Sequence, residues 1–183
     1  MNNIYVTSDL HFCHQREFLY HPRGFSNVND MNEAIVKNFN EVMDGSDNLY
    51  ILGDVMLNDN DTGIELLNRL PGQHIYIIPG NHDTTTRLEL YKQQPRVHVL
   101  GFAEIIKYNG YHFYMSHYPT FTTNFDDDKK FKARIFSLSG HTHSKEIWQP
   151  ACPSSYNVAL DAHNNYPCNI EDILNSFKEI FNK

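Results

Sequence analysis

Five short motifs hold the side chains of this sequence that could do chemistry, and each follows a stretch with the pattern of a β-strand. In chain order they are Asp9-Leu10-His11, Gly53-Asp54, Gly80-Asn81-His82-Asp83, Ser116-His117 and Gly140-His141-Thr142-His143. They supply carboxylates, imidazoles and one amide. Two divalent metal ions that share a carboxylate need this mixture of oxygen and nitrogen donors, with positions left open for water and substrate.

Strands and helices must position these motifs, because the motifs lie far apart in the chain. In the first half, apolar runs predict strands at 4–8, 49–52 and 75–78, and apolar residues at helical spacing predict helices at 32–42 and 62–70. This alternation implies parallel strands joined by right-handed crossovers. In such sheets the site lies beyond the carboxyl ends of the strands, which is where the first three motifs fall.

The second half has a different pattern. Asn109-Gly110 is a type I′ turn signal and predicts a β-hairpin between 104–108 and 111–115. Further strands are expected at 135–139 and 156–160, and a closing amphipathic helix is expected at 171–181. Two sheets packed face to face with helices outside are the predicted architecture.

Length and composition fit one compact enzyme domain. The chain has 183 residues and a formal net charge of −7, which argues against an extended nucleic-acid-binding surface. Its start has no basic stretch and no long apolar run, so we expect neither a signal peptide nor a membrane span. Cys13, Cys152 and Cys168 show no metal-type spacing, and free thiols in a reducing cytoplasm are expected.

The ordered series of motifs resembles that of the calcineurin-like metallophosphoesterase superfamily. The superfamily pattern runs D-x-H, G-D, G-N-H-D/E, H, G-H-x-H, and this sequence matches it with no element missing. The resemblance implies an α/β fold, a four-layer α/β/β/α sandwich of two mixed sheets flanked by helices. We expect one such domain over residues 1–183.

The resemblance also implies two metal sites. Asp9, His11 and His143 would bind one ion, Asp54 would bridge, and the second ion would be bound by Asn81, His117 and His141. A carboxylate has two oxygens and can span two cations, whereas an imidazole cannot. Because the donors are nitrogen and oxygen with no thiolate, Mn, Fe or Zn is favoured over Ca or Mg. Mn is the first expectation for the two divalent ions, with Fe, Zn or Ni as alternatives.

His82 follows the expected ligand Asn81, and the resemblance implies that it faces the substrate. It would bind phosphoryl oxygens or protonate the leaving oxygen, and a structural role is the alternative. In the phosphoprotein-phosphatase branch, the Gly-Asp motif continues into Asp-Arg-Gly. Here Val55-Met56-Leu57-Asn58 follows Asp54, so the phosphate-gripping arginine is missing from that loop.

The first third carries a narrower resemblance, to small bacterial and phage phosphoesterases. It rests on residues 7–14, on Pro22-Arg23-Gly24-Phe25 and on Met31-Asn32-Glu33. That group usually has Gly at the position of Cys13 and Arg-Pro-Phe in place of the second stretch. His14 and Arg23 are therefore candidates for binding the substrate phosphate, and an ordinary polar loop is the alternative.

We expect no catalytic role for the remaining candidate residues. Residues 120–134 are expected to form an exposed loop, with a lid beside the metals as the alternative. Aromatic residues that flank strands are more often core than base-stacking, and this applies to Trp148, Tyr118 and Phe121. The histidines outside the motifs are expected on the surface: His21, His74, His98, His112 and His163.

The resulting functional hypothesis is a dinuclear-metal phosphoesterase. A hydroxide held between the metal ions would attack a small phosphoester, with a phosphodiester or cyclic phosphate of nucleotide type favoured over a phosphoprotein. A phosphomonoesterase is the first alternative, and a non-catalytic scaffold with the same fold is an alternative of another class. A bacterial or phage protein acting in the cytoplasm is expected, and the pattern makes no prediction of an oligomeric state.

Overall fold

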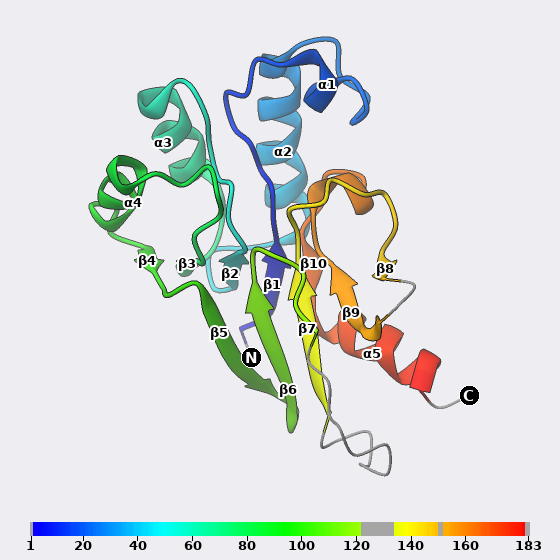
Figure 1. The fold of residues 1–183 in the computed structure, drawn as a ribbon. Coiled ribbons are helices and arrows are strands. Elements are labelled where there is room, and N and C mark those ends of the chain that lie inside the picture. Colours follow the sequence, from blue (N-terminus) through cyan, green and yellow to red (C-terminus); the bar gives the residue numbers. More distant parts are fainter. Residues whose placement is uncertain (1, 122–133, 150–151, 182–183) are drawn as a thin grey trace.

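Two five-stranded sheets form the centre of the computed structural model, which describes residues 2–121, 134–149 and 152–181 (Figure 1). The first sheet has the order β10-β1-β2-β3-β4. Its parallel strands are β1 (Ile4–Thr7), β2 (Asn48–Ile51), β3 (His74–Ile77) and β4 (Val97–Val99), and β10 (Cys168–Asn169) runs antiparallel to β1. Thr7 pairs with Ile51, and Ile51 with Ile77, so β1, β2 and β3 end level with one another.

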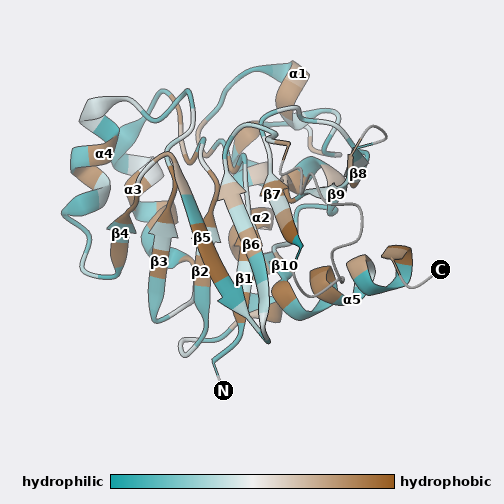
Figure 2. Ribbon diagram, turned by 60° about the horizontal axis from the view of Figure 1, so that its bottom comes forward, coloured by the Kyte–Doolittle hydropathy of each residue, from teal (hydrophilic) through white to brown (hydrophobic). Residues whose placement is uncertain are grey.

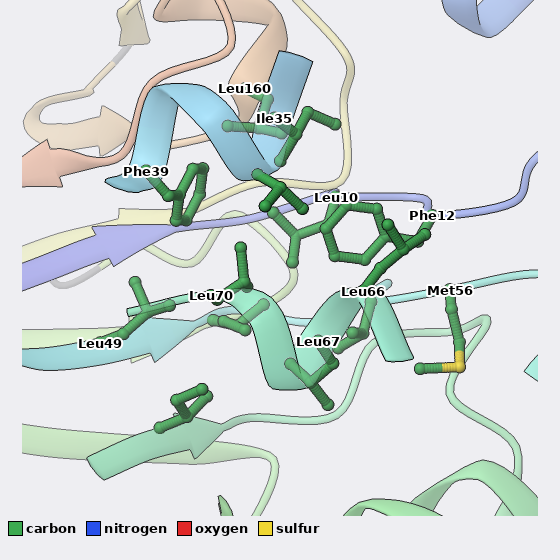
Figure 3. Close-up of a cluster of buried hydrophobic side chains, with 14 of the residues drawn as sticks. Leu10, Phe12, Ile35, Phe39, Leu49, Met56, Leu66, Leu67, Leu70 and Leu160 are labelled. Carbon is green, nitrogen blue, oxygen red and sulfur yellow. The ribbon is translucent and has the colours of Figure 1, made fainter. Parts of the chain in front are cut away.

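Helices cover one face of this sheet. They are α1 (Glu17–Tyr20), α2 (Val28–Val42), α3 (Asn60–Arg69) and α4 (Thr85–Lys92). The Asn27 side chain caps α2 by accepting a hydrogen bond from the Asp30 amide, and Asp59 caps α3 in the same way. The apolar stripes of α2 and α3 form a core with residues of the sheet and of the loop after β1; Figure 3 shows Ile35, Phe39, Leu66, Leu67, Leu70, Leu10 and Leu49 in it.

The second sheet has the order β5-β6-β7-β9-β8. Its strands are β5 (Ala103–Tyr108), β6 (Tyr111–Ser116), β7 (Ile135–Ser139), β8 (Trp148–Gln149) and β9 (Cys152–Asn157). β6, β7 and β9 are parallel, and β5 joins β6 in an antiparallel hairpin. Asn109 and Gly110 have φ angles of 48° and 85° at its turn, as the type I′ prediction requires.

A second core joins the two sheets to the last helix, α5 (Ile170–Phe181). Val6, Leu52 and Ile78 face it from the first sheet, and Phe136 from the second. α5 alternates apolar and polar segments (Figure 2), and its Phe177 ring stacks on Phe136 with centroids 4.2 Å apart. The predicted α/β fold of two mixed sheets with flanking helices is therefore confirmed.

The structure corrects several local predictions. α2 begins four residues earlier than the predicted helix, because Asn27 caps it. The strand expected at 156–160 exists, but its bounds are wrong: β9 runs from Cys152 to Asn157, and a 3-10 turn, η2 (Leu160–Ala162), comes after it. α1, α4, β4, β8 and β10 are too short or too polar to have been predicted. The expected loop or lid at 120–134 lies largely outside the described residues, which omit 122–133.

Some single residues also differ from expectation. His163 is half-buried rather than exposed, and its Nε2 lies 2.7 Å from the Asn157 carbonyl oxygen. Trp148 packs on Tyr156 and Phe177 as a core residue would. Tyr118 and Phe121 are exposed, so the core reading is wrong for these two aromatics.

Candidate metal centre

The five motifs meet at one edge of the two sheets, at the carboxyl ends of β1, β2, β3, β6 and β7 (Figure 1). Backbone hydrogen bonds tie the motif loops together: the Asp9 amide donates to the Gly53 carbonyl, the His11 amide to the Asp54 carbonyl, and the Gly140 amide to the His117 carbonyl. The first sheet thus contributes Asp9, His11, Asp54 and Asn81, and the second contributes His117, His141 and His143.

Asp9, His11 and His143 form what we call the first cluster. The Nε2 atoms of His11 and His143 are 3.1 Å apart, and each lies 3.7 Å from Asp9 Oδ1. Asp9 and His11 are buried, while the His143 side chain is 35% exposed. Three donor atoms at these separations could hold one metal ion.

Asn81, His117 and His141 form the second cluster. His117 Nε2 lies 2.9 Å from Asn81 Oδ1 and 3.2 Å from His141 Nδ1. The His117 Nδ1–H donates to the Leu52 carbonyl oxygen at 2.8 Å, which leaves a lone pair on Nε2. That lone pair faces the Asn81 carbonyl oxygen, and two acceptors in contact repel unless a cation lies between them.

Asp54 lies between the two clusters. Its Oδ2 is 3.6 Å from His11 Nε2 and 3.5 Å from His117 Nε2. Its Oδ1 accepts a hydrogen bond from the His82 amide. This is the position that a carboxylate must have to reach both clusters at once.

The protonation of Asp9 and His11 also fits cation binding. Asp9 Oδ1 is buried and has no hydrogen-bond partner among the residues that the structure describes. Burial disfavours the charge of Asp9, but His11 and His143 outweigh it and lower the pKa to about 2. Burial lowers the pKa of His11 to about 4, so its ring is neutral and free to donate electrons to a metal. Burial, with Asp9 and Asp83 nearby, raises the pKa of Asp54. A bound cation would stabilise the ionised carboxylate.

Backbone strain is concentrated in the same residues. Asp9, His11, Asp54, His141 and His143 have φ angles between 50° and 69°, a region that non-glycine residues rarely adopt. Strained backbone is tolerated where surrounding structure fixes it, and it clusters at functional sites.

Two motif glycines are required by close contacts. A Cβ on Gly80 would collide with the side chain and the amide nitrogen of Asp54. A Cβ on Gly140 would collide with Ser8 Oγ and Asp9 Oδ2. The glycines therefore let neighbouring strand ends bring the carboxylates into the site.

His82 and His14 line a cavity of about 320 Å³ beside the two clusters. His82 Nε2 is 4.0 Å from Asp54 Oδ2, its side chain is 43% exposed, and its ring lies 6.4 Å from that of His14. Burial, followed by the nearby His82, lowers the pKa of His14 to about 4. Arg16, Phe18 and Leu19 line the same cavity. Both histidines are thus placed to meet a molecule that contacts the clusters.

Arg23 does not line this cavity, in contrast to the expectation that it binds substrate phosphate. Its guanidinium is buried and forms a two-pronged ion pair with Asp161, with Nε–Oδ1 and NH2–Oδ2 distances of 3.1 and 2.7 Å. It also donates to the carbonyl oxygens of Asp9 and Leu10. With these partners, the group points toward the protein interior, and the geometry does not support the expected contact.

Sequence reasoning missed Asp161 and Asp83. Asp161 Oδ2 lies 3.1 Å from His143 Nδ1, yet the sole sequence signal is an Asp-x-His spacing outside the motif pattern. Asp83 ends a recognised motif, and its carboxylate accepts hydrogen bonds from the amides of Asp54, Val55 and Gly80.

This fold and site place the chain in a known class of enzyme. The calcineurin-like phosphoesterase family matches residues 3–181, and the chain belongs to that family. The family hydrolyses phosphoric esters with divalent metal ions, and the Asp and His groups described above could bind such ions.

The chain is also similar to particular proteins in sequence or in fold. The chain is 33% identical over 182 residues to the uncharacterized protein MJ1445 of Methanocaldococcus jannaschii, covering 95% of this chain and 90% of that protein. The fold resembles that of AQ665 from Aquifex aeolicus, a protein of unknown function, with a TM-score of 0.70, 22% identity and coverage of 94% and 98%. It also resembles Yfce, a phosphoesterase from E. coli, with a TM-score of 0.50, 14% identity and coverage of 86% and 78%.

Within residues 2–121, 134–149 and 152–181, no helix is both long enough and apolar enough to cross a membrane.

Proposed function

We propose that this protein is a dinuclear-metal phosphodiesterase that acts on a phosphodiester or cyclic phosphate of nucleotide type. The observation that carries the proposal is the position of Asp54 Oδ2, within 3.6 Å of a histidine nitrogen in each cluster. In this proposal Asp9, His11 and His143 hold one ion, Asn81, His117 and His141 hold the other, and Asp54 contacts both. Because both sheets contribute donors, residues 1–183 would act as one catalytic domain.

Bound divalent ions would supply Lewis acidity and an activated water as nucleophile. Oxygen and nitrogen donors without thiolate favour Mn, with Fe, Zn or Ni as alternatives. The chain's own residues would do the rest. His82 lies at the cavity wall beside Asp54, where it would bind a phosphoryl oxygen or give a proton to the leaving oxygen. Neutral His14, whose ring lies 6.4 Å from that of His82, would offer a further hydrogen bond to the substrate.

The charge of the cavity supports a diester over a monoester. Among the cavity-lining residues that the structure describes, Arg16 is the one side chain with a permanent positive charge. Arg23 lies outside the cavity and is paired with Asp161. A monoester dianion would need more positive charge than a diester monoanion. Free, buried thiols at Cys13, Cys152 and Cys168 fit the proposed cytoplasmic location. A phosphomonoesterase remains the alternative that the same metal cluster would permit.

A substrate panel tests the proposal. Metal-depleted protein is reloaded with Mn and assayed with bis(p-nitrophenyl) phosphate, a 2′,3′-cyclic nucleotide and p-nitrophenyl phosphate, with Asp54→Asn as the inactive control. We expect a higher kcat/KM for the diesters than for the monoester. A clear preference for the monoester would support the phosphatase alternative. A protein that binds metal and hydrolyses none of the three would support the scaffold.

A further inference from the structure

A buried ion pair lies next to the first cluster and outside the five motifs. Arg23 follows α1, and Asp161 lies in η2, the 3-10 turn after β9. Their side chains are 1% and 7% exposed. The two N–H···O contacts are side by side, which fixes the plane of the Asp161 carboxylate relative to the guanidinium.

The carboxylate of Asp161 is in turn placed to orient His143. Asp161 Oδ2 is 3.1 Å from His143 Nδ1, so the Nδ1–H donates to it, and in the neutral ring the lone pair is then on Nε2. That Nε2 is the atom that faces His11 Nε2 and Asp9 Oδ1. Carboxylates that accept from the second nitrogen of a metal-binding histidine set both its tautomer and its ring orientation.

Arg23 reaches the other side of the first cluster through the backbone. It donates to the Asp9 carbonyl at 2.8 Å and to the Leu10 carbonyl at 3.2 Å. These carbonyls belong to the loop in which Asp9 and His11 have φ angles of 60° and 51°. One guanidinium thus holds both the strained loop that carries two donors and the carboxylate that orients the third.

Among the described residues, no buried ion pair of this kind supports the second cluster. There the Nδ1–H of His117 donates to the backbone carbonyl of Leu52, which no side-chain substitution removes. A side-chain carboxylate therefore orients a histidine of the first cluster, and a backbone carbonyl orients one of the second. A substitution in the ion pair should change metal affinity at the first cluster more than at the second.

We propose that Arg23 and Asp161 are positioning residues for one metal site of this enzyme, the site formed by Asp9, His11 and His143. The inference rests on the proposed two-metal function. It assigns Arg23 to metal-site geometry instead of substrate binding, and it adds Asp161 as a residue on which metal occupancy depends.

Titration of Mn(II) into metal-free protein tests this, with each binding event resolved by calorimetry and bound metal counted by mass spectrometry. For Asp161→Asn we expect one of the two binding events to weaken about 10- to 100-fold, the range seen when such supporting groups are replaced. The other event should stay within twofold. Arg23→Lys keeps the positive charge but loses the bidentate contact with Asp161. We expect it to weaken the same Mn(II) binding event by a smaller factor.

The chain offers a matched control. Arg69 and Glu33 form another bidentate pair, with shorter distances of 2.7 and 2.6 Å, but their side chains are 40% and 61% exposed and do not line the cavity. Glu33→Gln and Arg69→Lys should leave both binding events unchanged. If these controls weaken Mn(II) binding as much as Asp161→Asn does, the positioning role is wrong.

A double-substitution cycle identifies the affected site. His143→Ala should remove or weaken one event, and adding Asp161→Asn to it should change nothing further, because Asp161 acts through His143. If the two effects add, Asp161 supports the fold in general and the inference fails. If Asp161→Asn does not fold, the same comparison is made with Asp161→Glu and His143→Ala.

The outcomes separate this inference from the proposed function. Wild-type protein that binds two Mn(II) ions but cleaves no phosphodiester would overturn the function alone. Wild-type protein that binds fewer than two ions would overturn both. Wild-type affinity for both ions in Asp161→Asn and Arg23→Lys would overturn the inference alone.

Discussion

His82 lies within one of the five motifs, but its imidazole is outside both donor clusters. Its backbone amide donates to Asp54 Oδ1, and the Arg87 guanidinium donates to its carbonyl oxygen at 2.6 Å, so the loop that carries it is held from both sides. The imidazole itself is free to face the cavity. Its position separates substrate chemistry from metal binding within a single motif.

We therefore expect His82→Ala to keep its bound metal and to lose turnover by about 100-fold or more, as when one acid or hydrogen-bond donor is removed. Asp54→Asn, by contrast, should lose metal from both clusters, because its carboxylate contacts both. Metal content by mass spectrometry and kcat with the preferred diester are measured on the same preparations. Loss of metal from His82→Ala would show that this histidine supports the metal centre.

At the scale of elements, Asp83 connects the ends of β2 and β3 with α4. Its carboxylate accepts from the amides of Asp54, Val55 and Gly80, and from the Tyr91 hydroxyl of α4 at 2.9 Å. Parallel strand ends leave such amides without partners, and one buried carboxylate satisfies three of them. The loop spacing that brings Asp54 and Asn81 together depends on this connection.

Asp83→Ala should leave these buried donors unsatisfied and lower the free energy of unfolding by about 3 kcal/mol or more. The matched control is Asp59→Ala, which removes an exposed helix cap and should cost about 1 kcal/mol. Urea unfolding of the metal-free proteins measures both. Equal losses in the two variants would mean that Asp83 is an ordinary cap and not a connection between strand ends.

At the scale of the whole molecule, the site exists because the two sheets share one hydrophobic core and the motif-bearing ends of their strands meet at one edge. The cost is a concentration of buried ionisable groups at that edge, including Asp9, His11 and Asp54. Folding without metal must therefore keep His11 neutral and keep two carboxylates close together. The stability of the metal-free protein should accordingly depend on pH.

The sign follows from His11, whose pKa is lowered from 6.5 to about 4, chiefly by burial. Between these values the unfolded chain binds a proton that the folded protein does not, so stability falls as pH falls from 6.5 toward 4. At most about 2 kcal/mol should be lost from this group between pH 7 and pH 5. Urea unfolding of chelator-treated protein at these two pH values measures it. His11→Gln should reduce the dependence and leave the part that comes from His14, whose pKa is also lowered to about 4, whereas substitution of exposed His98 should not reduce it. An unchanged slope in His11→Gln would contradict the assignment.

Much of this protein follows from local sequence patterns. Apolar runs and helical spacing place β1, β2, β3, α2 and α3, because each element must bury one face, and Asn109-Gly110 specifies its hairpin because those residues tolerate positive φ. The ordered motifs predict the candidate donors as well, because side chains at the carboxyl ends of parallel strands lie at the same edge of a sheet.

Tertiary structure alone decided the direction of Arg23 and the partner of His143. Arg23 and Asp161 are 138 residues apart in the sequence, and only the packed fold brings them into contact. Sequence patterns show periodicity over one or two elements and carry no information on which way a loop side chain points. An arginine near a metal motif therefore suggests phosphate binding, whether its guanidinium faces the cavity or the protein interior. Here the interior has a buried carboxylate and two backbone carbonyls to offer, and a buried charge is most stable where such partners satisfy it.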